Sequence, residues 1–185
     1  MRKVERSDVL DFKTYNDQRD SYRERIILEK AKRRVHVGEY LTFLFESTAT
    51  MLYQVQEMTR LEQIVREAEI QHEIDTYNQL LGEPGELGCT LLIEIDSQAE
   101  RDVLLKAWLD LPAHLYVKLE GGGEARAIWD RAQIGETRLS SVQYLKFQIG
   151  DGVPVAIGAD HPRLSVEAAL TGAQRETLRL DLRAT

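Results

Sequence analysis

The spacing of apolar residues changes several times between a helical and an extended period, and this alternation limits the possible folds more than any other feature. An apolar residue every three or four positions predicts a helix, whereas runs rich in β-branched and aromatic residues predict strands. Helices are predicted at 16–33, 50–66, 67–81, 98–109 and 172–182, and extended segments at 34–46, 87–95, 115–119, 124–129, 143–149, 153–157 and 164–169.

This order of elements predicts an α+β fold. Strands that are not regularly separated by crossover helices favour an antiparallel or mixed sheet over a doubly wound parallel one. We therefore expect a mostly antiparallel or mixed sheet with helices packed on one face, preceded by an N-terminal helical segment. The 185 residues fit a single domain, 1–185, with a possible sub-boundary near 82–88 between a helix-rich and a strand-rich part.

Three local signals refine this prediction. Ser7 is a good helix N-cap, so a short helix is expected from there through Tyr15. Gly38 predicts a bend that divides the extended segment 34–46 into two short strands. The run Gly121-Gly122-Gly123 predicts a hairpin turn between two strands.

Cys89 is the only cysteine, which rules out an intrachain disulfide and any metal site built from several cysteines. It lies in a predicted strand, where a lone thiol is usually a core residue. No apolar run approaches the roughly 20 residues of a membrane-spanning helix, and no apolar stretch follows the N-terminus as in a signal peptide. We therefore expect a cytoplasmic protein that does not enter a membrane.

Charge is distributed unevenly along the chain. Residues 1–35 hold eleven Lys and Arg against seven Asp and Glu, a charge of +4. The rest of the chain carries a charge of −11, which gives the net charge of −7. The net negative charge of the rest of the chain repels phosphates, and nucleic-acid binding is therefore not expected. The basic segment around Lys30 and Arg33 is at least as well suited to an acidic protein partner.

The predicted helix pair 50–81 carries most of the polar side chains that could perform chemistry. If they met in one pocket, a carboxylate and an imidazole could act there as an acid and a base. The alternative is a solvated or ion-paired helix surface, which is the commoner arrangement. The candidate catalytic residues are Glu57, Arg60, His72, Glu73 and Tyr77.

Metal binding has one weak candidate in the same helices. Glu69-x-x-His72 has the spacing used by di-iron helical bundles, but those sites need a second such pair, which the chain lacks. A metal site would therefore have to recruit His36, His114 or His161 through the fold. The sequence assigns no cofactor.

Four further residues are candidates for contact with a ligand or partner. His36 and Arg34 lie where a basic helix meets a strand and can bind a phosphate or carboxylate. A histidine there can instead cap the end of the helix, where a cation is favoured. Gln54 and Asn78 add amide groups on the helix pair.

Several uncommon strings occur in an order that resembles the bacterial domain of unknown function 3501 family. The resemblance covers nearly the whole chain and implies a role near rubrerythrin-like and iron–sulfur oxidoreductase-like proteins, although it supplies no activity. The strings are Arg33-Arg34-Val35-His36-Val37-Gly38-Glu39-Tyr40, Tyr53-Gln54-Val55-Gln56-Glu57-Met58, His72-Glu73-Ile74-Asp75-Thr76-Tyr77-Asn78, Pro84-Gly85-Glu86-Leu87, Ser141-Val142-Gln143-Tyr144-Leu145 and Asp160-His161-Pro162.

These observations lead to one main hypothesis and two rivals. The main hypothesis is a cytoplasmic accessory protein that binds a redox partner, or a second copy of itself, through the surface of residues 50–81 and the strand region 35–46. The first rival is a small enzyme built on the Glu57 and His72 group. The second rival is a metal-binding protein. With one thiol and one Glu-x-x-His pair, the chain is not expected to assemble a redox cofactor alone.

Overall fold

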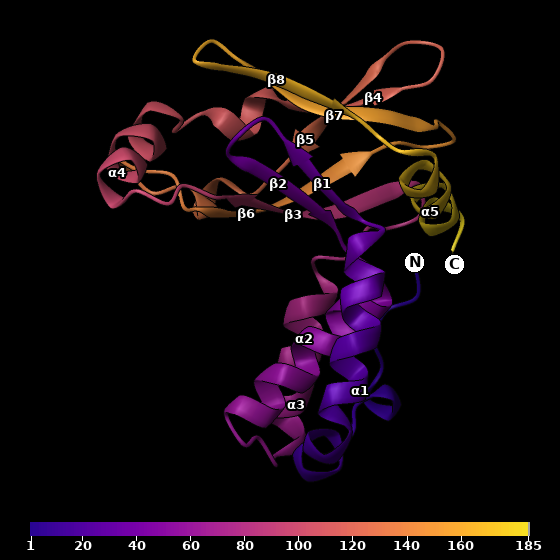
Figure 1. Ribbon diagram of the computed structural model, residues 1–185. Coiled ribbons are helices and arrows are strands. Elements are labelled where there is room, and N and C mark those ends of the chain that lie inside the picture. Colours follow the sequence, from indigo (N-terminus) through magenta and orange to yellow (C-terminus); the bar gives the residue numbers. More distant parts are fainter. Residues whose placement is uncertain (185) are drawn as a thin grey trace.

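Eight strands form one antiparallel sheet that curls until it is nearly a barrel (Figure 1). The structure is a computed structural model and describes residues 1–184. The strand order is β1-β2-β3-β6-β5-β4-β7-β8. The strands are β1 (Arg34–Val37), β2 (Leu41–Phe45), β3 (Glu86–Ile93), β4 (Leu115–Leu119), β5 (Glu124–Ile128), β6 (Val142–Gln148), β7 (Pro154–His161) and β8 (Leu164–Ala169).

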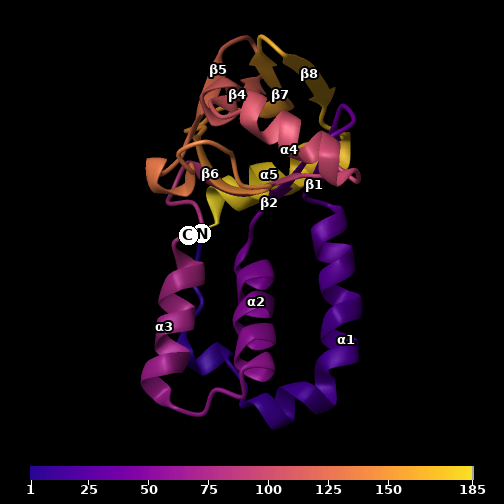
Figure 2. The same ribbon diagram turned by 90° about the vertical axis from the view of Figure 1, so that its left-hand side faces the viewer.

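The helices form a bundle on one side of this sheet and close its ends. In Figures 1 and 2, α1, α2 and α3 extend from the sheet together, while α4 and α5 lie at opposite ends of it. The α-helices are α1 (Phe12–Ala31), α2 (Thr48–Leu61), α3 (Glu67–Asn78), α4 (Gln98–Ala107) and α5 (Gly172–Arg183), and the short 3₁₀ helices are η1 (Arg6–Asp8), η2 (Leu111–His114) and η3 (Arg131–Gln133). The predicted α+β class with an N-terminal helical segment is confirmed.

Alternating side chains explain why the sheet curls around a core. Along β6 every second residue is buried, as expected for a strand with one face towards the interior. Phe43, Leu91, Phe147 and Ile157 are fully buried in the resulting cluster. Leu105 of α4 and Leu178 of α5 are also fully buried there, so both end helices contribute to the same core.

Gly38 forms the turn between β1 and β2, as predicted, and its position also explains the near closure of the sheet. Its φ of +62° is readily adopted only by glycine. A Cβ atom built there would lie 2.9 Å from Cγ1 of Val166 in β8, too close for a side chain. The two outermost strands of the sheet therefore approach each other at this turn.

Two local predictions were wrong, both at the N-terminal side of the sheet. Ser7 does not cap a short helix that runs to Tyr15; it lies inside η1, and Tyr15 belongs to α1, which Asp11 caps by accepting hydrogen bonds from the backbone of Lys13 and Thr14. His36 does not cap the end of that helix, because α1 ends at Ala31 and His36 lies within β1.

A second, smaller apolar cluster holds the helical bundle together. Met51 and Val55 of α2 pack there with Ile70 and Ile74 of α3, and Val4 joins them from the N-terminal segment. This cluster is distinct from the core of the sheet. The attachment of bundle to sheet therefore depends on the residues between the two clusters, and several of these are charged.

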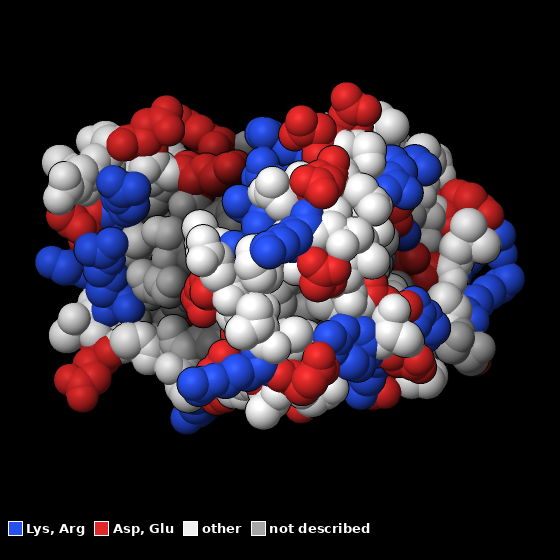
Figure 3. Space-filling view, turned by 90° about the horizontal axis from the view of Figure 1, so that it is seen from below, with Lys and Arg blue, Asp and Glu red and all other residues white. Residues whose placement is uncertain are grey.

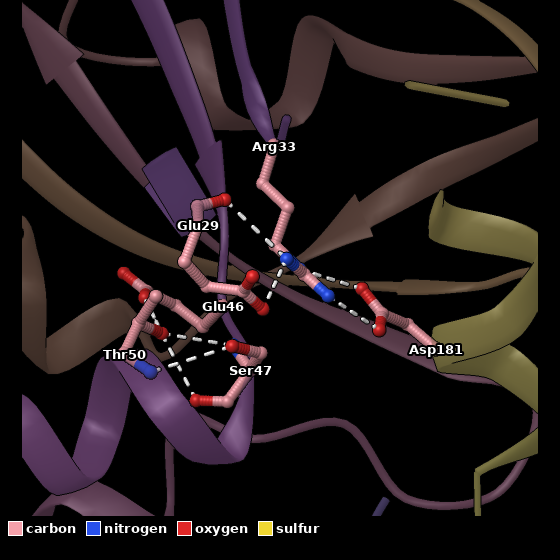
Figure 4. Close-up of polar contacts among 6 residues, drawn as sticks. All are labelled: Glu29, Arg33, Glu46, Ser47, Thr50 and Asp181. Atoms are coloured by element: carbon pink, nitrogen blue, oxygen red, sulfur yellow. Dashed lines mark hydrogen bonds and ion pairs between the residues drawn. The ribbon is translucent and has the colours of Figure 1, made fainter. Parts of the chain in front are cut away.

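Arg33 is the main charged residue at this junction (Figure 4). Its side chain is only 8% exposed and lies just after α1. The guanidinium donates to both carboxylate oxygens of Asp181 in α5 at 2.8 Å and to Glu29 in α1 at 2.5 Å. Because a guanidinium matches a carboxylate with two parallel hydrogen bonds, the first and last helices are held in one orientation.

Glu46 makes a second polar connection at the junction. This buried carboxylate accepts hydrogen bonds from Thr50 in α2 and Thr90 in β3, each at 2.6 Å. Burial raises the pKa of Glu46, and the hydrogen bonds from the two threonines oppose that rise. Ser47 beside it caps α2, so the start of the helix is fixed to the end of β2.

We predict that Arg33→Met destabilises the protein by about 3–5 kcal/mol, because Asp181 would keep a buried charge without a partner. The free energy of unfolding in urea measures this loss. Arg66→Met is the matched control, since the Arg66 side chain is 80% exposed in its pair with Glu69 and its loss should leave stability unchanged. Equal effects of the two substitutions would contradict this account of the junction.

Candidate binding cleft

A half-open cleft of about 490 Å³ lies between the end of α3 and the outer side of β5 and β6. Seen from the helical end of the molecule, the surface is hollowed beside the helices, and acidic and basic side chains are interspersed over this face (Figure 3). Clefts of this size commonly hold ligands or segments of partners. Its lining residues are Thr76, Tyr77, Gln79, Leu80, Cys89, Ile128, Trp129, Asp130, Gln133, Tyr144, Leu145 and Lys146.

Aromatic and aliphatic side chains dominate the walls of the cleft. Tyr144 and Ile128 are 42% and 52% exposed, a large exposure for side chains of this kind. Nε1 of Trp129 is buried and has no hydrogen-bond partner within residues 1–184. Burial, together with the nearby carboxylate of Glu73, raises the pKa of the Tyr77 hydroxyl. Such amphipathic aromatic groups are enriched in binding sites.

The floor of the cleft includes the sole thiol of the chain. Cys89 is buried in β3, as the sequence predicts, and burial raises its pKa well above the ordinary value. A protonated, buried thiol is a poor nucleophile. Cys89 therefore contributes apolar surface to the cleft and no reactive group.

An unpaired strand edge borders the cleft. Strand β6 pairs with β3 over its whole length, but it pairs with β5 only at Phe147 and Lys146. Beyond those residues the chain leaves β5 and turns into η3. The backbone of β6 on this side must therefore find other partners.

Side-chain amides and a hydroxyl supply those partners. The Gln133 side chain accepts a hydrogen bond from the Tyr144 backbone N–H at 2.8 Å and donates one to the Tyr144 carbonyl at 3.1 Å. Two residues earlier on the same edge of β6, the Ser140 hydroxyl accepts a hydrogen bond from the Val142 N–H. The Gln143 side chain donates a hydrogen bond to the Val142 carbonyl. Gln133 thus occupies the backbone groups that a neighbouring strand would use.

Glu57, one of the predicted catalytic residues, lies away from this cleft and joins α1 to α2. Its carboxylate accepts hydrogen bonds from the Tyr15 hydroxyl at 2.7 Å and from Arg19 at 2.8 and 2.9 Å, and Arg60 lies 3.3 Å away. Tyr15 is fully buried. Two of the candidate catalytic residues, Glu57 and Arg60, therefore lie together, but the other groups that Glu57 contacts belong to the helical bundle.

The charge of Glu57 is strongly favoured in this setting. Burial alone would raise its pKa, but hydrogen bonds from Arg19 and Tyr15 and the charge of Arg60 outweigh burial and lower the pKa to about 2. A carboxylate with a depressed pKa is a poor proton acceptor at neutral pH. The geometry thus favours a stabilising role for Glu57.

The remaining candidates from the sequence are dispersed. Tyr77 lines the cleft, whereas His72 lies exposed on α3 and the carboxylate of Glu69 faces Arg66 at 3.3 Å. Within residues 1–184, neither His72 nor Glu69 belongs to a group of side chains spaced to hold a metal ion. The structure therefore does not bring the predicted catalytic set into one cleft.

The predicted contact residues also have separate positions. The Asn78 amide donates to the Val4 carbonyl and accepts from its N–H, which fixes the N-terminal segment to α3. The His36 ring lies 2.7 Å from the Thr42 hydroxyl across the β1–β2 ladder. Arg34 is exposed on β1, and Gln54 is half-buried on α2.

The fold and cleft define an α+β protein with a nearly closed antiparallel sheet and an aromatic cleft beside its helical bundle. A family model described as "Protein of unknown function (DUF3501)" matches residues 3–182, and the chain belongs to this family. The sequence matches no curated protein. A crystal structure of a novel protein of unknown function from Burkholderia pseudomallei K96243 is similar to this chain with a TM-score of 0.90 and 27% identity, over 98% of this chain and 100% of that one. Within residues 1–184, no helix has the length and apolar character needed to cross a bilayer.

Sequence reasoning identified Tyr77 but missed most of the cleft. Trp129 and Tyr144 lie in predicted strands, where aromatic residues are ordinary. Gln133 lies between two predicted strands and gives no local signal of its role. The resemblance string that contains Tyr144 was the one available indication.

We predict that Glu57→Gln lowers stability at pH 7 by about 3 kcal/mol, from the difference between an unfolded-state pKa near 4.5 and the folded value of about 2. The contribution of a carboxylate with a depressed pKa is complete above its unfolded pKa and declines as pH falls towards its folded pKa. The difference in free energy of unfolding between wild type and the Glu57→Gln variant should therefore decrease by about 2 kcal/mol between pH 7 and pH 3.

Urea unfolding at a series of pH values measures this gap. Glu62→Gln, at the exposed end of α2, is the control and should change the free energy of unfolding little. A pH-independent gap for Glu57→Gln would show that its charge does not stabilise the bundle.

Proposed function

We propose that this protein is a binding protein that receives an extended segment of a protein partner in the cleft between α3 and β6. In this role the protein is an accessory to its partner, and what it does is bind that partner. One observation carries it: the Gln133 side chain occupies the backbone hydrogen-bonding groups of Tyr144 at the unpaired edge of β6.

An incoming strand can replace Gln133 without leaving polar groups unsatisfied. Extended peptides commonly bind by adding a strand to an exposed sheet edge, with affinity from main-chain hydrogen bonds and specificity from side-chain contacts. Here the main-chain groups of Val142 and Tyr144 would supply the hydrogen bonds. Displacing Gln133 breaks two hydrogen bonds and allows two equivalent ones to form, so the exchange costs little.

The walls of the cleft suit side chains projecting from such a strand. Ile128 and Tyr144 are exposed next to the edge, and Tyr77 faces them from α3. Partly exposed aromatic and aliphatic groups become the main source of binding energy once a partner excludes water. Apolar residues at alternate positions of the partner segment would meet these walls.

We further propose that the partner is a redox protein of the cytoplasm. The resemblance described above supports this through the rubrerythrin-like and iron–sulfur oxidoreductase-like proteins that it implies. The charge distribution is compatible with it, because the basic N-terminal part can meet an acidic surface outside the cleft.

The test uses purified rubrerythrin-like and iron–sulfur oxidoreductase-like proteins of the same organism, titrated into the full chain by calorimetry. We predict micromolar or tighter binding to one of them, reduced at least about tenfold by Ile128→Asp, because a buried charge without a partner opposes association. Val103→Asp is the matched control, since Val103 is likewise exposed, on α4, and should bind as the wild type does.

Two results would contradict the proposal. One is the absence of binding to any of these proteins at micromolar concentrations. The other is equal binding by the Ile128→Asp and Val103→Asp variants. Sedimentation of the chain alone provides a further test, because a dimer lost only in Ile128→Asp would assign the cleft to a second copy instead.

A further inference from the structure

We propose that Asp110, His114 and His161 together bind one divalent transition-metal ion at the end of β7. Each residue offers one ligand atom, and these atoms all lie within 4.8 Å of one another. Two imidazoles and one carboxylate form the ligand set of many zinc and non-haem iron(II) sites.

The strand pairing explains how these residues meet. Asp110 precedes η2, and His114 ends it immediately before β4. Strand β4 pairs antiparallel with β7, with Leu115 opposite Ala159. This register places His114 beside Asp160 and His161 at the end of β7, and the Asp110–His114 separation of four residues brings the carboxylate to the same point.

The ligand atoms are close enough together to share one ion. Nε2 of His161 lies 3.0 Å from Oδ1 of Asp110, and Nε2 of His114 lies 3.4 Å from Oδ2 of the same carboxylate. Bonds of about 2.0–2.1 Å at tetrahedral angles place neighbouring ligand atoms about 3.3–3.4 Å apart. The two rings meet edge to face with centroids 5.0 Å apart, so both can direct a nitrogen to one point.

The surroundings of His114 provide independent support. Its Nδ1 lies 3.3 Å from Oδ1 of Asp160, and the other oxygen of Asp160 accepts a 2.7 Å hydrogen bond from Arg126. A histidine ligand usually donates its second N–H to a carboxylate that is itself held in place. Asp160 and Arg126 thus orient His114 so that Nε2 faces Asp110.

His161 must change its protonation pattern when a metal binds. Its Nδ1 accepts a hydrogen bond from the Arg163 backbone N–H at 3.1 Å, so Nε2 carries the proton in the metal-free protein and donates it to Asp110. An ion at Nε2 displaces that proton to Nδ1, which then repels the Arg163 N–H. The turn at Pro162 and Arg163 is exposed and can shift, so the Arg163 amide reports metal binding.

Solvent exposure indicates a site with open coordination positions. The His161 side chain is 5% exposed, His114 28% and Asp110 69%. The ion would be held from the buried side by His161 and reached by water from the side of Asp110. Three protein ligands with an open position are the pattern of exchangeable or reactive metal sites.

The experiment titrates the full chain with Zn²⁺ by calorimetry and with Co²⁺ by visible absorption. We predict one ion per chain, with binding lost in His114→Gln and in Asp110→Asn and weakened about tenfold in Asp160→Asn. His72→Gln, which changes an exposed histidine on α3, should bind as the wild type does. In ¹⁵N-labelled protein the Arg163 amide signal should shift on binding.

The variants are informative because Asp110 and His114 are partly exposed and their replacement should leave circular dichroism unchanged. Stoichiometric binding that survives both substitutions would overturn the site, as would the absence of binding at millimolar Zn²⁺. Binding accompanied by no change at Arg163 would also contradict the assigned role of His161.

Discussion

The contact between Arg33 and Asp181 is the interaction on which the rest of the structure depends. Arg33 lies between α1 and β1, and Asp181 lies on the last helix, so one side chain links the helical bundle, the sheet and the C-terminal helix. A buried ion pair adds little net stability compared with an apolar pair, but it tolerates only one geometry. The α1 end of the bundle is therefore held in one orientation relative to α5.

The fold was largely predictable because most elements have strong local signals. α5 begins at Gly172, the residue predicted, and the predicted hairpin around Gly121-Gly122-Gly123 is present. The failures have physical causes. α2 ends at Leu61 and not at the predicted residue 66, and the Leu61 side chain in its last turn is 68% exposed despite its helical spacing. The predicted short helix from Ser7 and the long helix from residue 16 are replaced by the three-residue η1 and by α1 from Phe12, because Asp11 supplies a cap between them.

The sites were far less predictable, because their residues meet through long-range pairing. Tyr77 could be named from its helix, but Gln133 bonds to Tyr144, which lies eleven positions further along the chain in a different element. The meeting of His114 with His161 follows from the register of β4 on β7, which no local pattern encodes. Glu57 was recognised as a polar centre, but only the structure shows that Tyr15 and Arg19 satisfy it.

The approach of Gly38 to Val166 limits how readily copies of the chain can aggregate through their sheets. Exposed outer strands are templates on which sheets polymerise. Because the two ends of this sheet face each other, little outer edge remains for such growth. The short unpaired stretch of β6 is the part of the sheet where another strand could still add, and there the side chains of Gln133, Ser140 and Gln143 occupy the backbone groups of Tyr144 and Val142.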